Sequence, residues 1–318
     1  MRLGLALIAL WCGGASSGAY AAFPEKPVRL IVPFAPGGGT DLVSRALGAG
    51  MAQALGQPVV IENKPGAGTV IGMDAVAKGA PDGYAIVMAT FAHAVNPSLV
   101  ARLPYVNDKA FAPVSLIGRG PNVLVVRTDS SFRTVEDIIA AARAKPGMLT
   151  YASQGNGTSA HLAGEMLANL ARIEMTHVPY RGAGPAMTDV MGGQVDMIFG
   201  TAAAVSPLIA AGKLRAVAVT SEAPSPALNG VPTIGATVPG YAVESWYGLY
   251  APAATPPAAI AVLNAAARAA ASTPEFLQKA KQEGLTVIAG SPAELEAYVR
   301  GEEARWHKIV TENKIRLD

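Results

Sequence analysis

The sequence has almost no cysteine. Its only one, Cys12, lies within residues 1–22, which have the features of a secretory signal peptide. Arg2 gives this segment a positive start, an apolar run follows, and Ala19-Tyr20-Ala21 fits a small-residue cleavage site. Without the segment no cysteine remains, which excludes disulfides, thiolate metal sites and a cysteine nucleophile. An exported chain without cysteine fits the bacterial periplasm, where we expect this protein.

Charged residues are scarce as well. They make up 15% of the chain, and the signs nearly balance, with 25 Lys and Arg against 23 Asp and Glu. A nucleic-acid partner would need a basic stripe, and this balance argues against one. No apolar run after residue 22 has the roughly 20 residues that a membrane span needs, so we expect no direct membrane insertion. The 51% hydrophobic content predicts a well-buried globule, long enough for two domains of ordinary size.

The sequence also lacks the residue clusters of enzymes and metal sites. Outside the signal segment, no nucleophile, base and orienting group occur together. No H-x-x-x-H spacing occurs, and the histidines are far apart in sequence: His93, His161, His177 and His307. We therefore expect no catalytic residue, no bound metal and no cofactor, and a function other than catalysis.

What the chain does contain is a regular alternation of strand and helix patterns. The expected strands are short, continuous apolar runs, which is typical of parallel strands covered on both faces. They fall at 28–34, 58–62 and 84–90 in the first half and at 148–152, 175–179 and 195–199 in the second. Each half is therefore a βαβαβ unit, the pattern of a doubly wound sheet. We predict an α/β protein of two such domains, with a hinge and a central ligand cleft.

The later segments refine this layout. Residues 246–250 are predicted to form a strand, and the Pro- and Gly-rich stretches around it indicate a crossover between domains. The final helix begins with Ser291-Pro292-Ala293-Glu294, a capping box, and buries a stripe of Leu295, Val299, Trp306 and Val310. The expected domains are 23–125 (first part of domain 1), 126–244 (domain 2) and 245–318 (crossover strand and C-terminal part of domain 1).

One short sequence pattern occurs twice. PFAPGGGTD (33–41) and YASQGNGTS (151–159) align without a gap, and each follows a strand and precedes a helix. A glycine-rich turn that begins a helix presents free backbone N–H groups and the positive end of the helix dipole, which suits an anion. The third strand of each half ends in threonine, at Thr90 and Thr201. Because ligands collect at the carboxyl ends of strands, we expect these two to face one zone with Thr40 and Thr158.

Nucleotides are poor candidates for this anion. Neither turn carries the Lys-Ser/Thr pair of a P-loop. Residues 155–160 match the dinucleotide pattern G-x-G-x-x-A, but that pattern also needs an acidic residue at the end of the second strand to hold ribose. Here Glu174 begins that strand, and Pro179-Tyr180-Arg181 ends it. Two turns in two similar halves instead suggest one anion held from both sides.

Several of these residues have a second interpretation. Thr40 and Thr158 could serve only as helix N-caps. Asp41 would repel an anion if it pointed inward, and could instead stabilise the first helical turn or order a water. His161 could lie near the anion or only pack locally. The aromatic residues could wall a cleft or belong to the core: Phe34, Phe91, Trp246 and Tyr247.

Further stretches carry a resemblance to a known family. They are FPEKPVRLIVPF (23–34), ENKPGAG (62–68), PDGY (81–84), YRG (180–182), GGQVD (192–196), VPT (231–233) and WYGL (246–249). Together with the first glycine turn, they resemble the extracytoplasmic solute receptors of tripartite tricarboxylate transporters, also called Bug or TctC-type receptors. The resemblance covers the whole chain after the signal segment.

The resemblance implies two α/β domains that close on a small carboxylate, held partly through ordered water by the loops Ala35–Asp41 and Ser153–His161. It also implies delivery to a membrane permease, although some relatives inform a sensor. We expect a monomer that binds a dicarboxylate or an aromatic acid; a signalling receptor and a secreted enzyme using the same cleft are the alternatives. The expected ligand-binding residues are Ala35, Gly38, Gly39, Thr40, Asp41, Thr90, Ser153, Gly157, Thr158, Ser159, His161 and Thr201.

Overall fold

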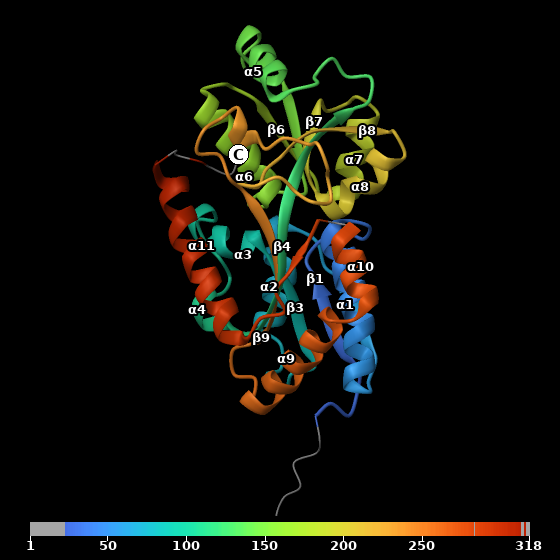
Figure 1. Ribbon diagram of the computed structural model, residues 1–318. Helices are drawn as coiled ribbons and strands as arrows, with labels where there is room; N and C mark the ends of the chain where they lie inside the picture. Colours follow the sequence, from blue (N-terminus) through green and yellow to red (C-terminus); the bar gives the residue numbers. More distant parts are fainter. Residues whose placement is uncertain (1–22, 283, 313–314, 316–318) are drawn as a thin grey trace, which may run out of the picture.

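A computed structural model describes residues 23–282, 284–312 and 315 of the protein (Figure 1). The signal segment expected at residues 1–22 lies outside the described residues. The first half contains three parallel strands in the order β2-β1-β3. They are β1 (Val28–Val32), β2 (Val59–Asn63) and β3 (Ala85–Thr90), and the helices between them are α1 (Gly39–Leu55) and α2 (Val70–Ala77), with a 3₁₀ turn η1 (Ala67–Thr69).

The second half repeats this arrangement. Its three strands are also parallel and follow the order β6-β5-β7. They are β5 (Thr150–Ser153), β6 (Thr176–Pro179) and β7 (Met197–Thr201), followed by the helices α6 (Ser159–Ala171), α7 (Ala183–Met191) and α8 (Ala202–Ala210) respectively. The two predicted βαβαβ units are therefore confirmed, and the central strand of each unit is the one that leads into a glycine turn.

Two long strands join the halves. Strand β9 (Glu244–Pro252) contains the strand predicted at 246–250, and it runs antiparallel to β3. Strand β4 (Phe111–Arg127) runs antiparallel to both β9 and β7, so one sheet extends through both halves (Figure 1). Strand β4 could not be predicted from the sequence, because its Pro113, Gly118 and Pro121 indicate breaks. The register shifts at Pro113/Ser115 and Leu116/Gly118 accommodate Pro113 and Gly118 at bulges.

The remaining helices pack around this sheet, and two further strands, β8 (Leu214–Val219) and β10 (Thr286–Val287), belong to it by pairing with β4. α9 packs on α1, and α11 packs on α3, so the end of the chain returns to the first half (Figure 1). The capping box of α11 is present: Ser291 N–H donates to the Glu294 carboxylate at 2.7 Å, and Glu294 N–H donates to Ser291 Oγ at 3.2 Å. Its predicted apolar stripe is buried. These elements are α3 (Phe91–Leu99), α4 (Asn107–Ala110), α5 (Val135–Ala144), β8 (Leu214–Val219), η2 (Ile234–Ala236), α9 (Pro257–Ala271), α10 (Pro274–Gln282), β10 (Thr286–Val287) and α11 (Pro292–Glu312).

The structural correspondence between the two glycine turns differs from their sequence alignment. The gapless alignment pairs Thr40 with Thr158, but the N-cap of α1 is Gly38 and the N-cap of α6 is Thr158. In each turn a glycine of positive φ precedes the cap, Gly37 at 86° and Gly157 at 74°. The structural match is thus shifted by two residues. Thr40 lies inside the helix, which corrects its interpretation as an N-cap.

Candidate functional site

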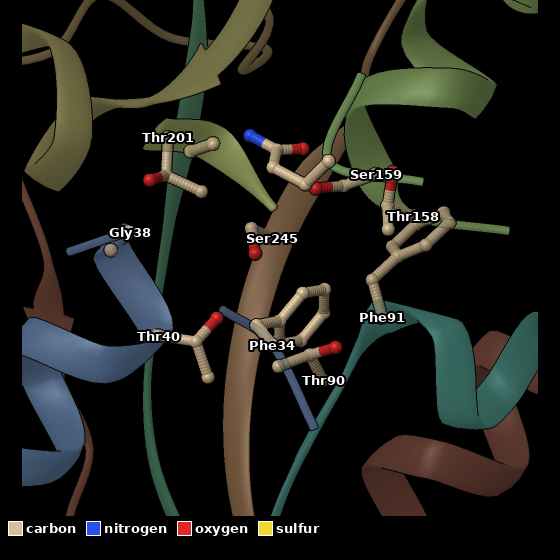
Figure 2. Close-up of a pocket in the computed structure, with 12 residues that line it drawn as sticks. Phe34, Gly38, Thr40, Thr90, Phe91, Thr158, Ser159, Thr201 and Ser245 are labelled. Carbon is tan, nitrogen blue, oxygen red and sulfur yellow. The ribbon is translucent and has the colours of Figure 1, made fainter. Parts of the chain in front are cut away.

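A pocket lies between the two halves, where the strands that precede the helices end (Figure 2). The space not filled by atoms is about 390 Å³, part of it open to solvent, and about 20 Å³ of it is wide enough for the centre of a water molecule. Figure 2 shows Thr40 and Thr90 of the first half facing Thr158 and Thr201 of the second. The lining residues are Phe34, Gly38, Gly39, Thr40, Thr90, Phe91, Gln154, Thr158, Ser159, Ala183, Thr201 and Ser245.

The four threonines expected to share one zone all line this pocket. Each is buried, with an exposed fraction between 4% and 9%. Their convergence follows from the topology: Thr90 and Thr201 end β3 and β7, while Thr40 and Thr158 lie where α1 and α6 begin. The ends of corresponding strands and the starts of corresponding helices in the two halves therefore meet across the pocket.

Helix N-termini supply most of the remaining lining. The helices α1, α3, α6, α7 and α8 all begin at the pocket, because the first residue or the N-cap of each is among the lining residues. No side chain caps α1, α3 or α8. The first backbone N–H groups of a helix have no partner within the helix, and they carry its positive dipole end. The pocket is thus electropositive without a lysine or arginine.

Asp41 does not bring negative charge into the pocket. Its carboxylate accepts hydrogen bonds from Gly37 N–H at 3.0 Å, Arg45 Nε at 2.9 Å and Asn63 Nδ2 at 2.9 Å. Burial opposes ionisation of this carboxyl, but the hydrogen bonds from Arg45, Gly37 and Asn63 hold its pKa below the ordinary value. Asp41 therefore fixes the first turn of α1, and the pocket lining contains no charged side chain.

Two lining residues carry buried polar atoms without a hydrogen-bond partner among the described residues. These atoms are Nε2 of Gln154 and Oγ1 of Thr201, and each residue is 9% exposed. An unpaired buried polar group costs about 1–3 kcal/mol, which a ligand that accepts its hydrogen bond would recover. The sequence analysis did not select Gln154, although it lies within the second glycine turn. It also missed Ser245, which β9 places in the pocket (Figure 2).

Five of the expected ligand-binding residues do not line the pocket: Ala35, Asp41, Ser153, Gly157 and His161. They shape the loops behind it. Ala35 N–H donates to the Arg181 carbonyl at 3.2 Å, a contact between the halves. Ser153 Oγ lies 2.7 Å from His177 Nε2, and Gly157 N–H donates to His161 Nδ1 at 3.2 Å. The imidazoles of His161 and His177 stack with centroids 4.2 Å apart, so His161 packs locally.

The aromatic residues that could wall the cleft also divide into residues that line the pocket and residues that do not. Phe34 and Phe91 wall the pocket (Figure 2). Trp246 is fully buried and packs against Tyr298, so it belongs to the core.

Among the described residues, no three His, Cys, Asp or Glu side chains are grouped as a metal site. No helix in the same part of the chain combines the length and apolarity of a membrane span.

Two α/β halves joined by crossing strands, with a pocket between them, define the class of periplasmic solute-binding proteins. The family model of the tripartite tricarboxylate transporter family receptor, TctC, matches residues 43–315. The chain belongs to this family, which consists of periplasmic solute-binding receptors and not of enzymes.

Similarity to known sequences and solved structures supports this family assignment. A UPF0065 protein of Pseudomonas sp., from the tcbD-tcbE intergenic region, is 40% identical over 92% of this chain and 88% of its own. An R. palustris protein solved with adipate is 34% identical, with a TM-score of 0.89 over 92% of this chain and 99% of its own. MatC from Rhodopseudomonas palustris, with bound malate, is 33% identical, with a TM-score of 0.87 over 91% and 100%.

Proposed function

We propose that the protein captures a small carboxylate, a dicarboxylate or an aromatic acid, between its two halves and delivers it to the permease subunits of a tripartite tricarboxylate transporter. The observation that carries this proposal is the pocket lining: hydrogen-bond donors and helix N-termini from both halves, without a charged side chain. The adipate and malate in the two R. palustris structures support the ligand class.

In this proposal one carboxylate lies between the first turns of α1 and α6. The backbone N–H groups of Gly39, Thr40 and Ser159 face it, and the unpaired Thr201 Oγ1 and Gln154 Nε2 complete its hydrogen bonds. A buried carboxylate needs several such donors to offset the loss of its hydration. Fixed dipoles can supply them without a counter-ion.

Binding would also favour contact between the halves. They already meet beside the pocket, through the hydrogen bond from Ala35 to Arg181 and through Gly38, on which a Cβ would lie 3.5 Å from that of Ala183. An acid that bridges α1 and α6 binds this arrangement better than one with the halves apart. The acid therefore shifts the equilibrium between the arrangement with the halves in contact and the one with the halves apart. The shift equals the difference between its binding free energies for the two arrangements.

The test is a thermal-shift screen of the purified protein against aliphatic and aromatic mono- and dicarboxylates, followed by calorimetry. A ligand at about 100-fold its dissociation constant adds roughly 2.7 kcal/mol to the free energy of unfolding. We expect at least one acid to raise the melting temperature and to bind with a stoichiometry of one. A panel without any such acid would contradict the proposal. Loss of uptake, and not only of gene induction, in a deletion strain tests the delivery step.

A further inference from the structure

A second, larger cavity adjoins the pocket. Its space not filled by atoms is about 1110 Å³, part of it open to solvent, and about 470 Å³ of it is wide enough for the centre of a water molecule. It shares Phe34, Gln154 and Thr158 with the pocket lining. The two spaces are therefore neighbours, with these three side chains between them. The other residues of the second cavity are Pro33, Gly66, Ala67, Gly68, Thr69, Val70, Asn96, Val100, Arg102, Gly155, Asn156, Pro179, Tyr180 and Arg181.

The second cavity differs from the pocket in its charge. Arg102 and Arg181 line it, and no carboxylate does. Within the described residues, neither guanidinium forms a hydrogen bond or an ion pair. Arg102 follows α3 in the first half, and Arg181 follows β6 in the second, so each half contributes one cation. Two uncompensated cations beside a neutral anion pocket favour a second anionic group on the same ligand.

The wall of this cavity has a costly backbone conformation. Four successive residues have positive φ: Gly66 at 131°, Ala67 at 47°, Gly68 at 58° and Thr69 at 79°. Asn96 holds this segment, since its Nδ2 donates to the Gly68 carbonyl at 2.9 Å. Backbone of this kind is often retained where a ligand or a partner surface requires it.

The same segment approaches the other half closely. A Cβ on Gly68 would lie 2.7 Å from the carbonyl oxygen of Asn156, beyond β5. Both halves therefore enclose the second cavity, as they enclose the pocket. A group bound there would bridge them a second time.

We propose that Arg102 and Arg181 bind a second carboxylate, so that the preferred ligand is a diacid that spans both spaces. This inference rests on the proposed function, because the near carboxylate must occupy the pocket. Phe34 and Gln154 line both spaces, so the carbon spacer passes between an apolar ring and an amide. The guanidinium group suits the far end, because its planar donors match a carboxylate.

The test compares acids that differ only in the second carboxylate: succinate with butyrate, adipate with hexanoate, and terephthalate with benzoate. Calorimetry uses the wild type, Arg102→Gln and Arg181→Gln. The control is Arg133→Gln, which removes an exposed arginine that is not part of either lining. We expect the wild type to bind the best diacid at least about tenfold more tightly than its matched monoacid.

Each cavity variant should lose about tenfold in affinity for the diacid and keep its monoacid affinity within about twofold. Arg133→Gln should change neither. Melting temperatures of the ligand-free variants show that they fold; both arginines are exposed, so we expect small shifts.

The alternative outcomes separate the two proposals. Equal affinity for monoacids and diacids, unchanged in the arginine variants, overturns the second-carboxylate site and leaves carboxylate capture intact. If no acid binds the wild type, carboxylate capture itself fails, and the second site fails with it. If the arginines only attract anions to the opening, their loss slows association of diacids more than of monoacids because of the larger charge, and the difference from the wild type disappears at high salt. That result also overturns the second site.

Discussion

The backbone N–H of Gly157 donates to Nδ1 of His161, the residue four positions later, at 3.2 Å. The first half contains the same arrangement, in which Gly37 N–H donates to the Asp41 carboxylate at 3.0 Å. In both turns a glycine of positive φ is tied to a side chain in the first turn of the following helix. The loops of the proposed carboxylate site are thus held in place by their own hydrogen bonds, which lowers the ordering cost of binding.

This arrangement predicts different effects for two alanine substitutions. Gly157→Ala and Gly37→Ala should each destabilise the fold by about 1–2 kcal/mol, because both positions have left-handed backbone. Only Gly157→Ala should also weaken acid binding, since its Cβ would lie 2.6 Å from Asn96 Oδ1 in the other half. A Cβ on Gly37 meets no atom within 4 Å. Denaturation and calorimetry measure the two effects, and equal affinity losses would contradict the role of this contact.

A second pair of substitutions separates binding from folding. Thr158 caps α6, because its Oγ1 accepts from His161 N–H at 3.4 Å, so Thr158→Val should cost about 1 kcal/mol of stability. Thr201 Oγ1 has no partner among the described residues, so Thr201→Val should leave stability nearly unchanged. It should weaken acid binding by roughly 1–3 kcal/mol. If Thr201→Val binds acids like the wild type, its hydroxyl does not contact the ligand.

Stability should fall as the solution becomes acidic. Burial lowers the pKa of His93 to about 3, and burial together with His161 lowers the pKa of His177 to about 3. Both rings regain an ordinary pKa of about 6.5 on unfolding, so below that pH the unfolded chain binds more protons. Their contribution to stability is complete above about pH 6.5. It is lost as the pH falls toward 3, by at most about 1.4 kcal/mol per pH unit for each ring.

His93→Phe tests this dependence. The ring of His93 lies between Phe111 and Tyr250, with centroids 5.4 and 4.8 Å away, so a phenyl group suits the site. Urea denaturation between pH 5 and 7 should show a shallower loss of stability in the variant than in the wild type. An unchanged slope would mean that His93 does not remain neutral in the folded protein.

The C-terminal helix should support the pocket wall. Trp306 is fully buried, and its ring meets Phe91 edge to face at 4.7 Å, while Phe91 lines the pocket. Trp306→Ala should cost about 3–5 kcal/mol of stability. Lys308→Ala, an exposed change on the same helix, should stay within about 0.5 kcal/mol. Denaturant midpoints measure both, and similar values would contradict the packing role.

The two βαβαβ units and the convergence of Thr90 and Thr201 could be predicted from the sequence, because continuous apolar runs are a local signal and the rule for strand ends is general. The crossing strand β4 could not, since Pro113 and Gly118 are accommodated by bulges and the pairing strands are distant in sequence. The two-residue shift between the glycine turns also escaped prediction. The positions of glycine and threonine in the sequence do not show which residue becomes the helix N-cap.

The site was predictable to a similar extent. Gly38, Gly39, Thr40 and Ser159 line the pocket as expected, because a helix start has a fixed geometry. Gln154, Ser245 and the arginines of the adjoining cavity depend on how the halves meet. No local pattern marks such residues.

The central claim is that one carboxylate lies between the first turns of α1 and α6. A crystal structure of the complex with the tightest acid of the panel tests it most directly. We predict one carboxylate within hydrogen-bond distance of Thr201 Oγ1, Gln154 Nε2 and the first backbone N–H groups of both helices. An acid bound through Arg102 and Arg181 alone, or outside the pocket, would contradict the claim.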